Sequence, residues 1–323
     1  MDALLKTIDL KKYFKVKSGA LHAVDGVNLE IPRGGTLGVV GESGCGKSTL
    51  GRTVIRLQDA TAGQILFDGQ DITDVKGKQL DELRQKMQII FQDPYSSLNP
   101  RMPVFKLISE PLENHHVYSD HKQINRRVIE LMDIVGLARR FVNTYPHEMD
   151  GGRRQRIGVA RALALNPQFI VCDEPVSALD VSIQAQILNL LMDLQDEFSL
   201  TYMFITHDLL VVRHIADEIA VMYLGQCIER APSKELFKNP LHPYTNALLS
   251  SIPVPDLSQR KKSVILHGEV SDPINPKPGC RFASRCQYCR EACRTADYPL
   301  LEVSQGHYVA CELIKPGRAI SRQ

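Results

Sequence analysis

The chain has 323 residues, with 39 Lys and Arg against 37 Asp and Glu, and 43% of its residues are hydrophobic. This composition excludes a disordered or collagen-like chain, and the length suits one large domain with an appendage or two modest domains. A formal net charge of +2 gives no field that would hold a nucleic acid or an anionic membrane surface by itself.

Sequence features that direct a chain into a membrane are missing. The longest charge-free stretch, residues 239–255, contains four prolines, and no run reaches the roughly 18 apolar residues of a membrane-spanning helix. The first residues lack a charged region followed by an apolar one, so we expect no secretory signal and a chain that stays in the cytoplasm.

The first part of the chain leads through short strands to a glycine-rich loop. We expect strands at residues 4–10 and 21–31 and a buried parallel strand at residues 36–40. Residues 41–48 then read G-x-x-x-x-G-K-S, and a helix-like segment follows. Backbone N–H groups in such a loop turn inward around an anion, Lys47 would neutralise the β and γ phosphates, and Ser48 can hold Mg²⁺. The pattern predicts a nucleotide-binding phosphate loop.

A second apolar strand, residues 169–172, ends in Asp173 and Glu174. Both carboxylates would lie at the carboxyl end of a central strand, where α/β sheets build their sites. Asp173 would hold Mg²⁺ through water and Glu174 would polarise the attacking water. An Asp-Glu pair is also a common turn dipeptide, and that alternative stays open.

Further polar residues follow other apolar runs. Gln92 comes after residues 87–91, and His207 comes after a strand expected at residues 201–206. A helix is predicted at 157–165, with two glycines at its start as a second anion-binding terminus, and an amphipathic helix from about 182 to 197. A lone histidine after a strand is usually a polar loop residue, but its place in this ordered series favours a phosphate contact.

These motifs in this order resemble the nucleotide-binding subunit of an ATP-binding cassette (ABC) transporter, and the resemblance covers nearly the whole chain. It implies an α/β fold of the P-loop NTPase type, with a RecA-like core, an antiparallel β subdomain, an α-helical signature subdomain and a C-terminal cysteine-rich extension. The expected divisions are 1–92 for the β subdomain and first part of the core, 93–167 for the helical subdomain, 168–230 for the second part of the core, and 231–323 for the extension.

The resemblance also implies roles for individual residues. The expected ATP-binding residues are Phe14 or Tyr13 at the adenine, with Phe14 preferred, then Gly41, Ser43, Gly44, Cys45, Gly46, Lys47, Ser48 and Thr49 of the Walker A motif, Gln92 of the Q-loop and Asp173 of the Walker B motif. The expected catalytic residues are Glu174, His207 and Gln92; Ser48, Gln92 and Asp173 would hold Mg²⁺, and Ser177 and Asp180 belong to the D-loop.

In this family two nucleotide-binding domains meet head to tail, and the signature of each contacts the ATP of the other. The signature residues here are Asp150, Gly151, Gly152 and Arg153, with Asp150 where the family usually has serine. An ionised carboxylate only accepts hydrogen bonds, and repulsion from a phosphate at ~4 Å costs about 4 kcal/mol, part of which Arg153 or Arg154 can offset. We therefore expect a heterodimer with one weakened site. In the alternative, Asp150 merely caps its helix.

The tail narrows the subfamily. Residues 240–249, 252–256, 275–276 and 279–282 resemble the ATPases of oligopeptide and dipeptide importers, nearest their F-type subunit. Nickel and glutathione importers share a looser form of this tail. The resemblance implies a second, D-type ATPase subunit, two transmembrane permease subunits, an extracytoplasmic peptide-binding protein as an indirect partner, and a peripheral place on the cytoplasmic face of the inner membrane. Residues 93–101 would contact the permeases, unless they form an ordinary surface loop.

Five of the eight cysteines lie between Cys280 and Cys311. Thiolates at such spacings suit zinc or an iron–sulfur cluster, and free thiols are a third possibility. The pair Cys286 and Cys289 favours zinc by spacing. The resemblance instead implies a [4Fe–4S] cluster on Cys280, Cys286, Cys293 and Cys311.

Two rivals remain to the importer function. One is a soluble ABC ATPase acting on nucleic acid, which the single cassette and near-zero charge disfavour. The other is a nucleotide-binding scaffold with negligible hydrolysis, which Lys47, Glu174 and His207 argue against.

Overall fold

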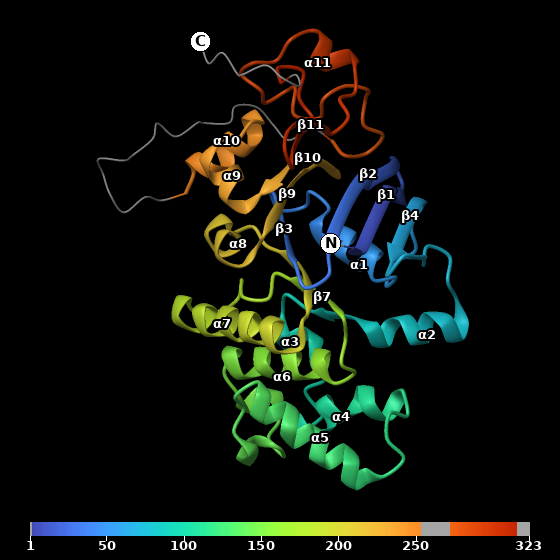
Figure 1. Cartoon of the computed structure of the whole chain (residues 1–323), viewed down its shortest axis with the longest axis vertical. Helices are drawn as coiled ribbons and strands as arrows, with labels where there is room; N and C mark the ends of the chain where they lie inside the picture. The colour runs from blue at the N-terminus through green and yellow to red at the C-terminus, as the bar shows by residue number, and fades with distance from the viewer. Residues whose placement is uncertain (1, 253–271, 315–323) are drawn as a thin grey trace. The chain divides into compact units, whose positions relative to one another are not determined.

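The computed structural model describes residues 2–252 and 272–314 (Figure 1). The predicted tail motif at residues 253–256 therefore lies outside the described residues. The chain forms two compact units. Unit 1 consists of residues 32–35 and 74–205, and unit 2 consists of residues 2–31, 36–73 and the described residues from 206 onward.

Unit 2 contains two sheets. The first has the strand order β2-β1-β4-β5, and the second carries the order β11-β12-β10-β9-β3. In the second sheet β3 pairs with β9 in parallel, whereas β9, β10, β12 and β11 are antiparallel neighbours. The strands are β1 (Ala3–Val16), β2 (Gly19–Pro32), β3 (Thr36–Val40), β4 (Ala62–Phe67), β5 (Gln70–Asp71), β9 (Glu218–Tyr223), β10 (Gln226–Pro232), β11 (Leu301–Ser304) and β12 (His307–Val309).

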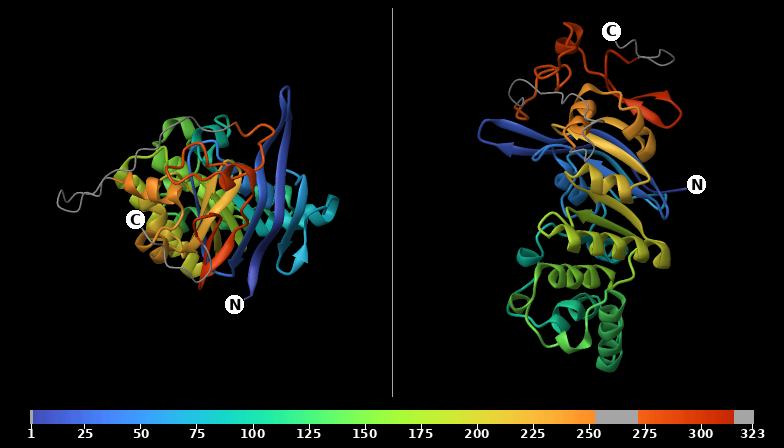
Figure 2. Two further views of the ribbon diagram at one scale, coloured as in Figure 1. Left: turned by 90° about the horizontal axis from the view of Figure 1, so that it is seen from above. Right: turned by 90° about the vertical axis from the view of Figure 1, so that its left-hand side faces the viewer.

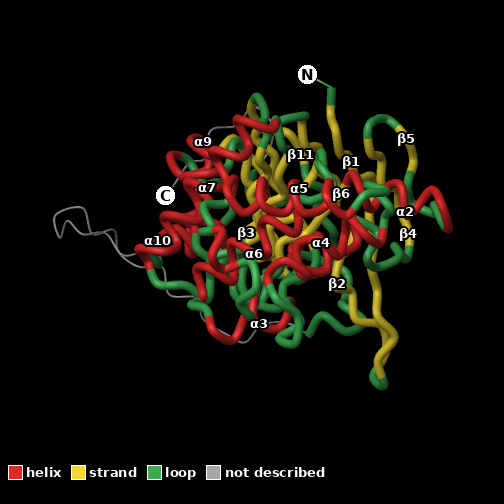
Figure 3. The backbone as a smooth tube through the Cα atoms, turned by 90° about the horizontal axis from the view of Figure 1, so that it is seen from below, coloured by secondary structure: helices red, strands yellow, loops and turns green. Residues whose placement is uncertain are grey.

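The prediction of β3 is confirmed to the residue, and all five of its uncharged residues are buried. The first two strands are longer than expected. β1 and β2 have 14 residues each and form the long ribbon drawn in blue in Figure 2 and in yellow in Figure 3. The pairing of β1 with β4 ends at Lys11, and most of the β1 residues beyond that point are only half-buried. The alternation that marks a half-buried strand is therefore lost there, although the strand continues.

Helices and rings pack together in unit 2. Its helices are α1 (Lys47–Val54), α8 (Leu209–Ile215), α9 (Ser233–Lys238), α10 (Pro243–Ser250) and α11 (Ala292–Thr295). Tyr223 of β9, Tyr244 of α10 and Phe282 are each at most 1% exposed. Their rings meet edge to face with centroids 4.7 to 5.5 Å apart, a favoured geometry for aromatic pairs. Phe282, from the C-terminal part of the chain, thus packs in the same core as β9 and α10.

Unit 1 combines three parallel strands with a group of helices. β7 (Phe169–Asp173) lies between β6 (Met87–Ile90) and β8 (Thr201–Ile205), with Phe169 opposite both Met87 and Thr201. The helices are α2 (Gly77–Lys86), α3 (Pro94–Ser97), α4 (Val104–Asn114), α5 (His121–Ile134), α6 (Gly151–Leu163) and α7 (Val181–Phe198), with short 3₁₀ turns at Arg139–Phe141 and Pro146–Glu148. α4, α5 and α6 pack against one another in Figure 1.

The predicted glycine pair at the start of α6 is confirmed. The helix begins at Gly151 because the Asp150 side chain accepts the N–H of Arg153 and caps it, and it ends at Leu163, two residues earlier than expected. α7 is confirmed to within one residue at each end. The four-part division of the chain stays a prediction. Within the described ranges, no helix has the length and apolar character needed to cross a membrane.

Candidate functional site

The predicted phosphate loop lies in unit 2 between β3 and α1. Lys47 is only 5% exposed, and its ammonium group turns back along the loop, donating to the carbonyl oxygen of Gly41 at 2.8 Å and to that of Glu42 at 2.9 Å. Lys47, the residue that is expected to bind phosphate, therefore holds the two ends of the loop together.

Two glycines of this loop are required by close backbone approach. A Cβ at Gly41 would lie 2.2 Å from the Met222 carbonyl oxygen, and one at Gly46 would lie 1.9 Å from the Ala23 carbonyl oxygen. Both residues have positive φ, at 152° and 102°, and glycine adopts such angles without strain. The loop can hold its shape only with glycine at these positions.

The two candidates for the adenine contact differ in their surroundings. The Tyr13 ring stacks on His22 with centroids 3.8 Å apart, and its hydroxyl is hydrogen-bonded to Asp25. Burial, together with this carboxylate, raises the pKa of Tyr13. The ammonium group of Lys12 lies 5.0 Å from the centroid of the Phe14 ring. The choice between Phe14 and Tyr13 stays a prediction.

In unit 1 the structure brings Gln92 and Glu174 together. The Gln92 amide donates to a Glu174 carboxylate oxygen at 2.8 Å, and the Ser177 hydroxyl donates to the Glu174 carbonyl oxygen at 3.2 Å. Asp173 ends β7 and is 1% exposed. Glu174 has a φ of 48°, so the turn at the strand end is real and presents a carboxylate held by an amide. The turn is therefore confirmed, and the roles of Asp173 and Glu174 towards magnesium and water stay predictions.

The signature residues form the start of α6. Asp150 accepts the N–H of Arg153 at 2.8 Å and forms an ion pair with its guanidinium group at 3.1 Å. The capping role proposed for Asp150 is thus confirmed. A Cβ at Gly151 would lie 2.9 Å from Leu179, and one at Gly152 would lie 2.7 Å from Ile183. The glycines let α6 approach Leu179 and the first turn of α7, whose N-cap residue is Asp180.

His207 is an exposed residue of unit 2. The next residue, Asp208, caps α8 by accepting the N–H of Leu210 at 2.8 Å.

The thiols of the C-terminal segment share one neighbourhood in unit 2. Burial raises the pKa of Cys311 to about 12, and the nearby thiols of Cys280, Cys286 and Cys293 add to this shift. The backbone N–H of Cys280 donates to the carbonyl oxygen of Cys293 at 2.8 Å. Within residues 2–252 and 272–314, no three His, Cys, Asp or Glu side chains are arranged to hold a metal ion. The geometry of these described residues therefore does not support a metal site.

Sequence reasoning missed two sets of contacts in unit 2, one at Glu42 of the phosphate loop and one at Glu229 of β10. Glu42 is bound by Arg285 and Tyr244, which follow it by more than 200 residues. The buried Glu229 carboxylate accepts the N–H groups of Leu241 and His242 and is hydrogen-bonded to His307. No local pattern signals either set, because their members come from distant parts of the chain.

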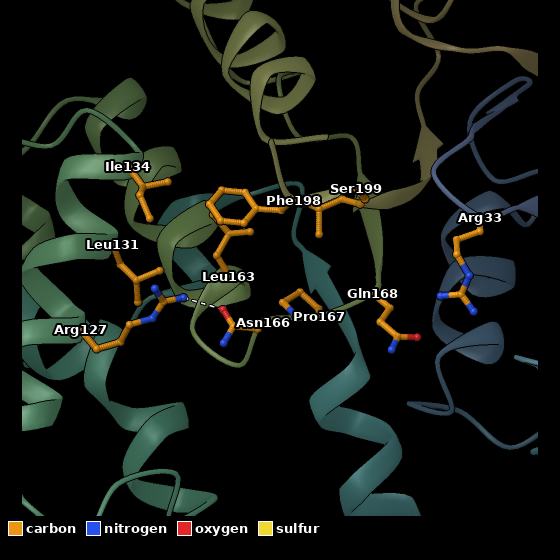
Figure 4. A pocket seen from close by; sticks show the side chains of 11 residues that line it. Arg33, Arg127, Leu131, Ile134, Leu163, Asn166, Pro167, Gln168, Phe198 and Ser199 are labelled. Carbon is orange, nitrogen blue, oxygen red and sulfur yellow. Dashed lines mark hydrogen bonds between the residues drawn. The ribbon is translucent and has the colours of Figure 1, made fainter. Parts of the chain in front are cut away.

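A pocket of about 370 Å³ lies in unit 1 (Figure 4). Leu131, Leu163 and Phe198 supply apolar wall, and Arg127 donates to the Asn166 side chain at 2.6 Å. None of the predicted site residues lines it.

A phosphate loop after a buried strand, an aspartate and glutamate after a second strand, and a glycine-led helix together define a P-loop ATPase of the ABC cassette type. The family model "ABC transporter" matches residues 24–177, and the model "Oligopeptide/dipeptide transporter, C-terminal region" matches residues 228–293. The chain belongs to the family of ATP-binding subunits of oligopeptide and dipeptide ABC transporters, and it is an ATP hydrolase.

Relatives of full length support this membership. The chain is 50% identical to the oligopeptide transport ATP-binding protein AppF of Bacillus subtilis, over 97% of this chain and 98% of AppF. It is 49% identical to the oligopeptide transport ATP-binding protein OppF of Salmonella typhimurium, over 97% of both. It is 48% identical to the dipeptide transport ATP-binding protein DppF of Haemophilus influenzae, over 95% of this chain and 96% of DppF.

Solved structures agree on the fold. The dimeric ATP-binding cassette MJ0796 bound to ADP and Pi is similar with a TM-score of 0.65 and 29% identity, covering 71% of this chain and 98% of that one. The protein cbiO1 of Clostridium perfringens gives a TM-score of 0.66 and 30% identity, covering 74% of this chain and 92% of that one.

Proposed function

We propose that this chain is the energy-coupling ATPase of an importer for oligopeptides or dipeptides. The observation that carries the proposal is the match of residues 228–293 to the C-terminal region of such transporters. The names of the full-length relatives support it. ATP binding would close a head-to-tail pair of nucleotide-binding domains on the cytoplasmic face of the inner membrane, and hydrolysis would open it to drive two permease subunits. A peptide-binding protein outside would deliver the substrate to those permeases.

We assign the chemistry to the chain's own residues as follows. The phosphate loop binds the triphosphate through its N–H groups and Lys47, and His207 contacts the γ-phosphate. Glu174 accepts a proton from the attacking water as a general base. The hydrogen bond from Gln92 to the Glu174 carboxylate supports this, since it fixes the orientation of the base.

The donor set for magnesium is chemically suitable. Ser48, Gln92 and Asp173 offer a hydroxyl, an amide and a carboxylate oxygen, which are the hard ligands that Mg²⁺ prefers. When bound, the ion neutralises charge on the phosphates.

The catalytic assignment is tested by Glu174→Gln in the complex assembled with the partner ATPase and permeases. We expect ATP binding to persist and hydrolysis to fall at least a hundredfold, because the base is lost. Glu197→Gln, an exposed residue of α7, is the matched control and should hydrolyse ATP normally. Undiminished hydrolysis by Glu174→Gln would refute the role of this residue.

The substrate is tested by transport in the same complex reconstituted into vesicles. Uptake of labelled di- and oligopeptides that requires ATP and an intact Glu174 supports the proposal. Uptake of nickel or glutathione in place of peptides would favour the alternative importers. ATPase activity without any need for the permeases would favour a non-transport ABC ATPase.

We propose residues 93–101 as the contact with the permeases. In this stretch Tyr95 is 57% exposed, and the Arg154 guanidinium lies 5.0 Å from its ring centroid. The Arg161 guanidinium also donates to the Ser97 carbonyl oxygen at 2.7 Å. Two arginines of α6, the helix that begins at the signature, thus contact residues 93–101. Through these contacts, a movement of α6 would be passed to the exposed turn.

We further propose a heterodimer with a D-type ATPase in which Asp150 makes one of the two sites weak. Its carboxylate accepts the N–H of Arg153 and pairs with its guanidinium group. A carboxylate also has no N–H or O–H to donate to a phosphate. Asp150→Ser should keep the cap and raise turnover at the partner's ATP. The same change at another capping residue, Asp120→Ser on α5, should leave turnover unaltered. Equal turnover of Asp150→Ser and wild type refutes the weak site.

We propose a [4Fe–4S] cluster on Cys280, Cys286, Cys293 and Cys311, with zinc as the alternative. The common neighbourhood of these thiols supports it, although their spacing in this structure does not match a bound metal. Iron, sulfide and zinc content of anaerobically purified chain distinguishes the two. Cys286→Ser should lose the metal and Cys289→Ser should retain it. Metal-free wild type with full activity refutes both.

A further inference from the structure

Two residues from the C-terminal part of unit 2, Tyr244 and Arg285, bind Glu42, the second residue of the phosphate loop. The Arg285 guanidinium meets both carboxylate oxygens of Glu42, with Nη1 2.8 Å from Oε2 and Nη2 3.1 Å from Oε1. The Tyr244 hydroxyl accepts the backbone N–H of Glu42 at 2.9 Å. Because Lys47 takes the Glu42 carbonyl oxygen, the side chain, the N–H and the C=O of this residue are all fixed.

The groups that bind Glu42 are themselves rigidly held. Tyr244 is fully buried, and its ring packs edge to face against Tyr223 and Phe282. Phe282 is 1% exposed and lies three residues before Arg285. The Arg285 side chain is 10% exposed, and its guanidinium also lies 3.5 Å from the Tyr223 hydroxyl. A bidentate pair that is packed in this way is stronger and more specific than an exposed ion pair.

Without a cationic partner, the negative charge of Glu42 would weaken the binding of phosphate by the loop. Its carboxylate sits two residues before Gly44 in a loop that must accept a triphosphate. Left alone, this negative charge would repel the ligand and would also be free to draw the backbone out of position. Arg285 removes both problems, since it neutralises the carboxylate and fixes it at two points.

We infer that Arg285 is a positioning residue for ATP, through which the C-terminal extension sets the affinity of the phosphate loop for nucleotide. The inference rests on the assignment of residues 41–49 as the phosphate loop made above. Arg285 acts through Glu42 and does not itself contact the nucleotide.

The test measures the dissociation constants of ATP and ADP on the full chain by titration calorimetry. Arg285→Gln should raise the Kd for ATP about tenfold, which is the effect of one uncompensated carboxylate near bound phosphates in the presence of salt. The rise should be smaller for ADP, which carries less charge. Arg285→Lys keeps the charge but not the two-point contact and should fall in between. Arg290→Gln, an exposed arginine of the same segment, should bind ATP as wild type does.

A double variant separates positioning from folding. Arg285→Gln with Glu42→Gln removes both charges and should recover most of the lost affinity, while the thermal midpoints without nucleotide stay close to that of the single variant. If the double variant binds ATP no better than Arg285→Gln alone, or if Arg285→Gln binds ATP like wild type, the inference is wrong. Lys47→Ala tests the loop assignment separately. Normal ATP binding by Lys47→Ala refutes the assignment itself, whereas lost binding there with unchanged binding in Arg285→Gln refutes only the role of Arg285.

Discussion

Acid should lower the free energy of unfolding of the chain through one buried histidine, His242. The His242 ring is 1% exposed and its Nδ1 accepts the N–H of Tyr244 at 3.1 Å, which caps α10. Burial lowers the pKa of His242 to about 4, although the nearby Glu229 carboxylate works against this shift. The ring is therefore neutral in the folded chain at pH 7.

The size of the effect follows from the difference between folded and unfolded states. The folded pKa of about 4 lies below the ordinary value of 6.5, so the unfolded chain takes up a proton first as the pH falls. The stabilisation is complete above pH 6.5 and is lost progressively towards pH 4. A difference of about 2.5 pKa units corresponds to about 3 kcal/mol. Glu229 accepts the backbone N–H of His242 and is hydrogen-bonded to His307, and His242→Asn leaves both residues in place.

Urea unfolding followed by circular dichroism between pH 7.5 and 4.5 measures this loss. Wild type should lose about 2.5 kcal/mol more than His242→Asn over this range, which stops short of pH 4, because the asparagine oxygen can still cap α10 but cannot titrate. His214→Asn, on an exposed position of α8, should keep the wild-type pH dependence. Parallel pH profiles for wild type and His242→Asn would refute the reasoning.

Two further substitutions test other features of unit 2. Gly46→Ala should abolish ATP binding, since its Cβ would lie 1.9 Å from a backbone oxygen, whereas Gly44→Ala, with no atom within 4 Å of the added Cβ, should bind ATP more weakly but measurably; calorimetry checks both, and equal binding by the two variants contradicts the clash. Glu229→Leu should lower the free energy of unfolding by about 3 to 5 kcal/mol, because His307 and two backbone N–H groups lose their buried partner. Urea titration checks this loss, and a change below about 1 kcal/mol would show that water replaces the carboxylate.

Local chemistry decided what could be predicted from the sequence. The strand before the phosphate loop and the strand before Asp173 were both confirmed because each is an uncharged apolar run with a clear end. The glycine pair at the start of α6 is confirmed as well, because Asp150 directly before it caps the helix.

Contacts between distant residues could not be predicted in this way. Arg285 and Glu42 are 243 positions apart, and neither residue carries a pattern that names its partner. The cysteine spacing suits a metal, but the arrangement that a metal requires is not a property of spacing alone, and the described residues do not show it.

The long sequence separation of Arg285 and Glu42 has a consequence for the synthesis of the protein on the ribosome. The phosphate loop is translated early, but its arginine is added 243 residues later. At about 5 to 20 residues per second, the wait is roughly 12 to 50 seconds. Asn275, which bonds to Ser18 and Ala20 near the other end of the chain, also arrives late. A nascent chain therefore carries the phosphate loop before Arg285 is present, and the tighter ATP binding inferred above becomes available only when the chain is nearly complete.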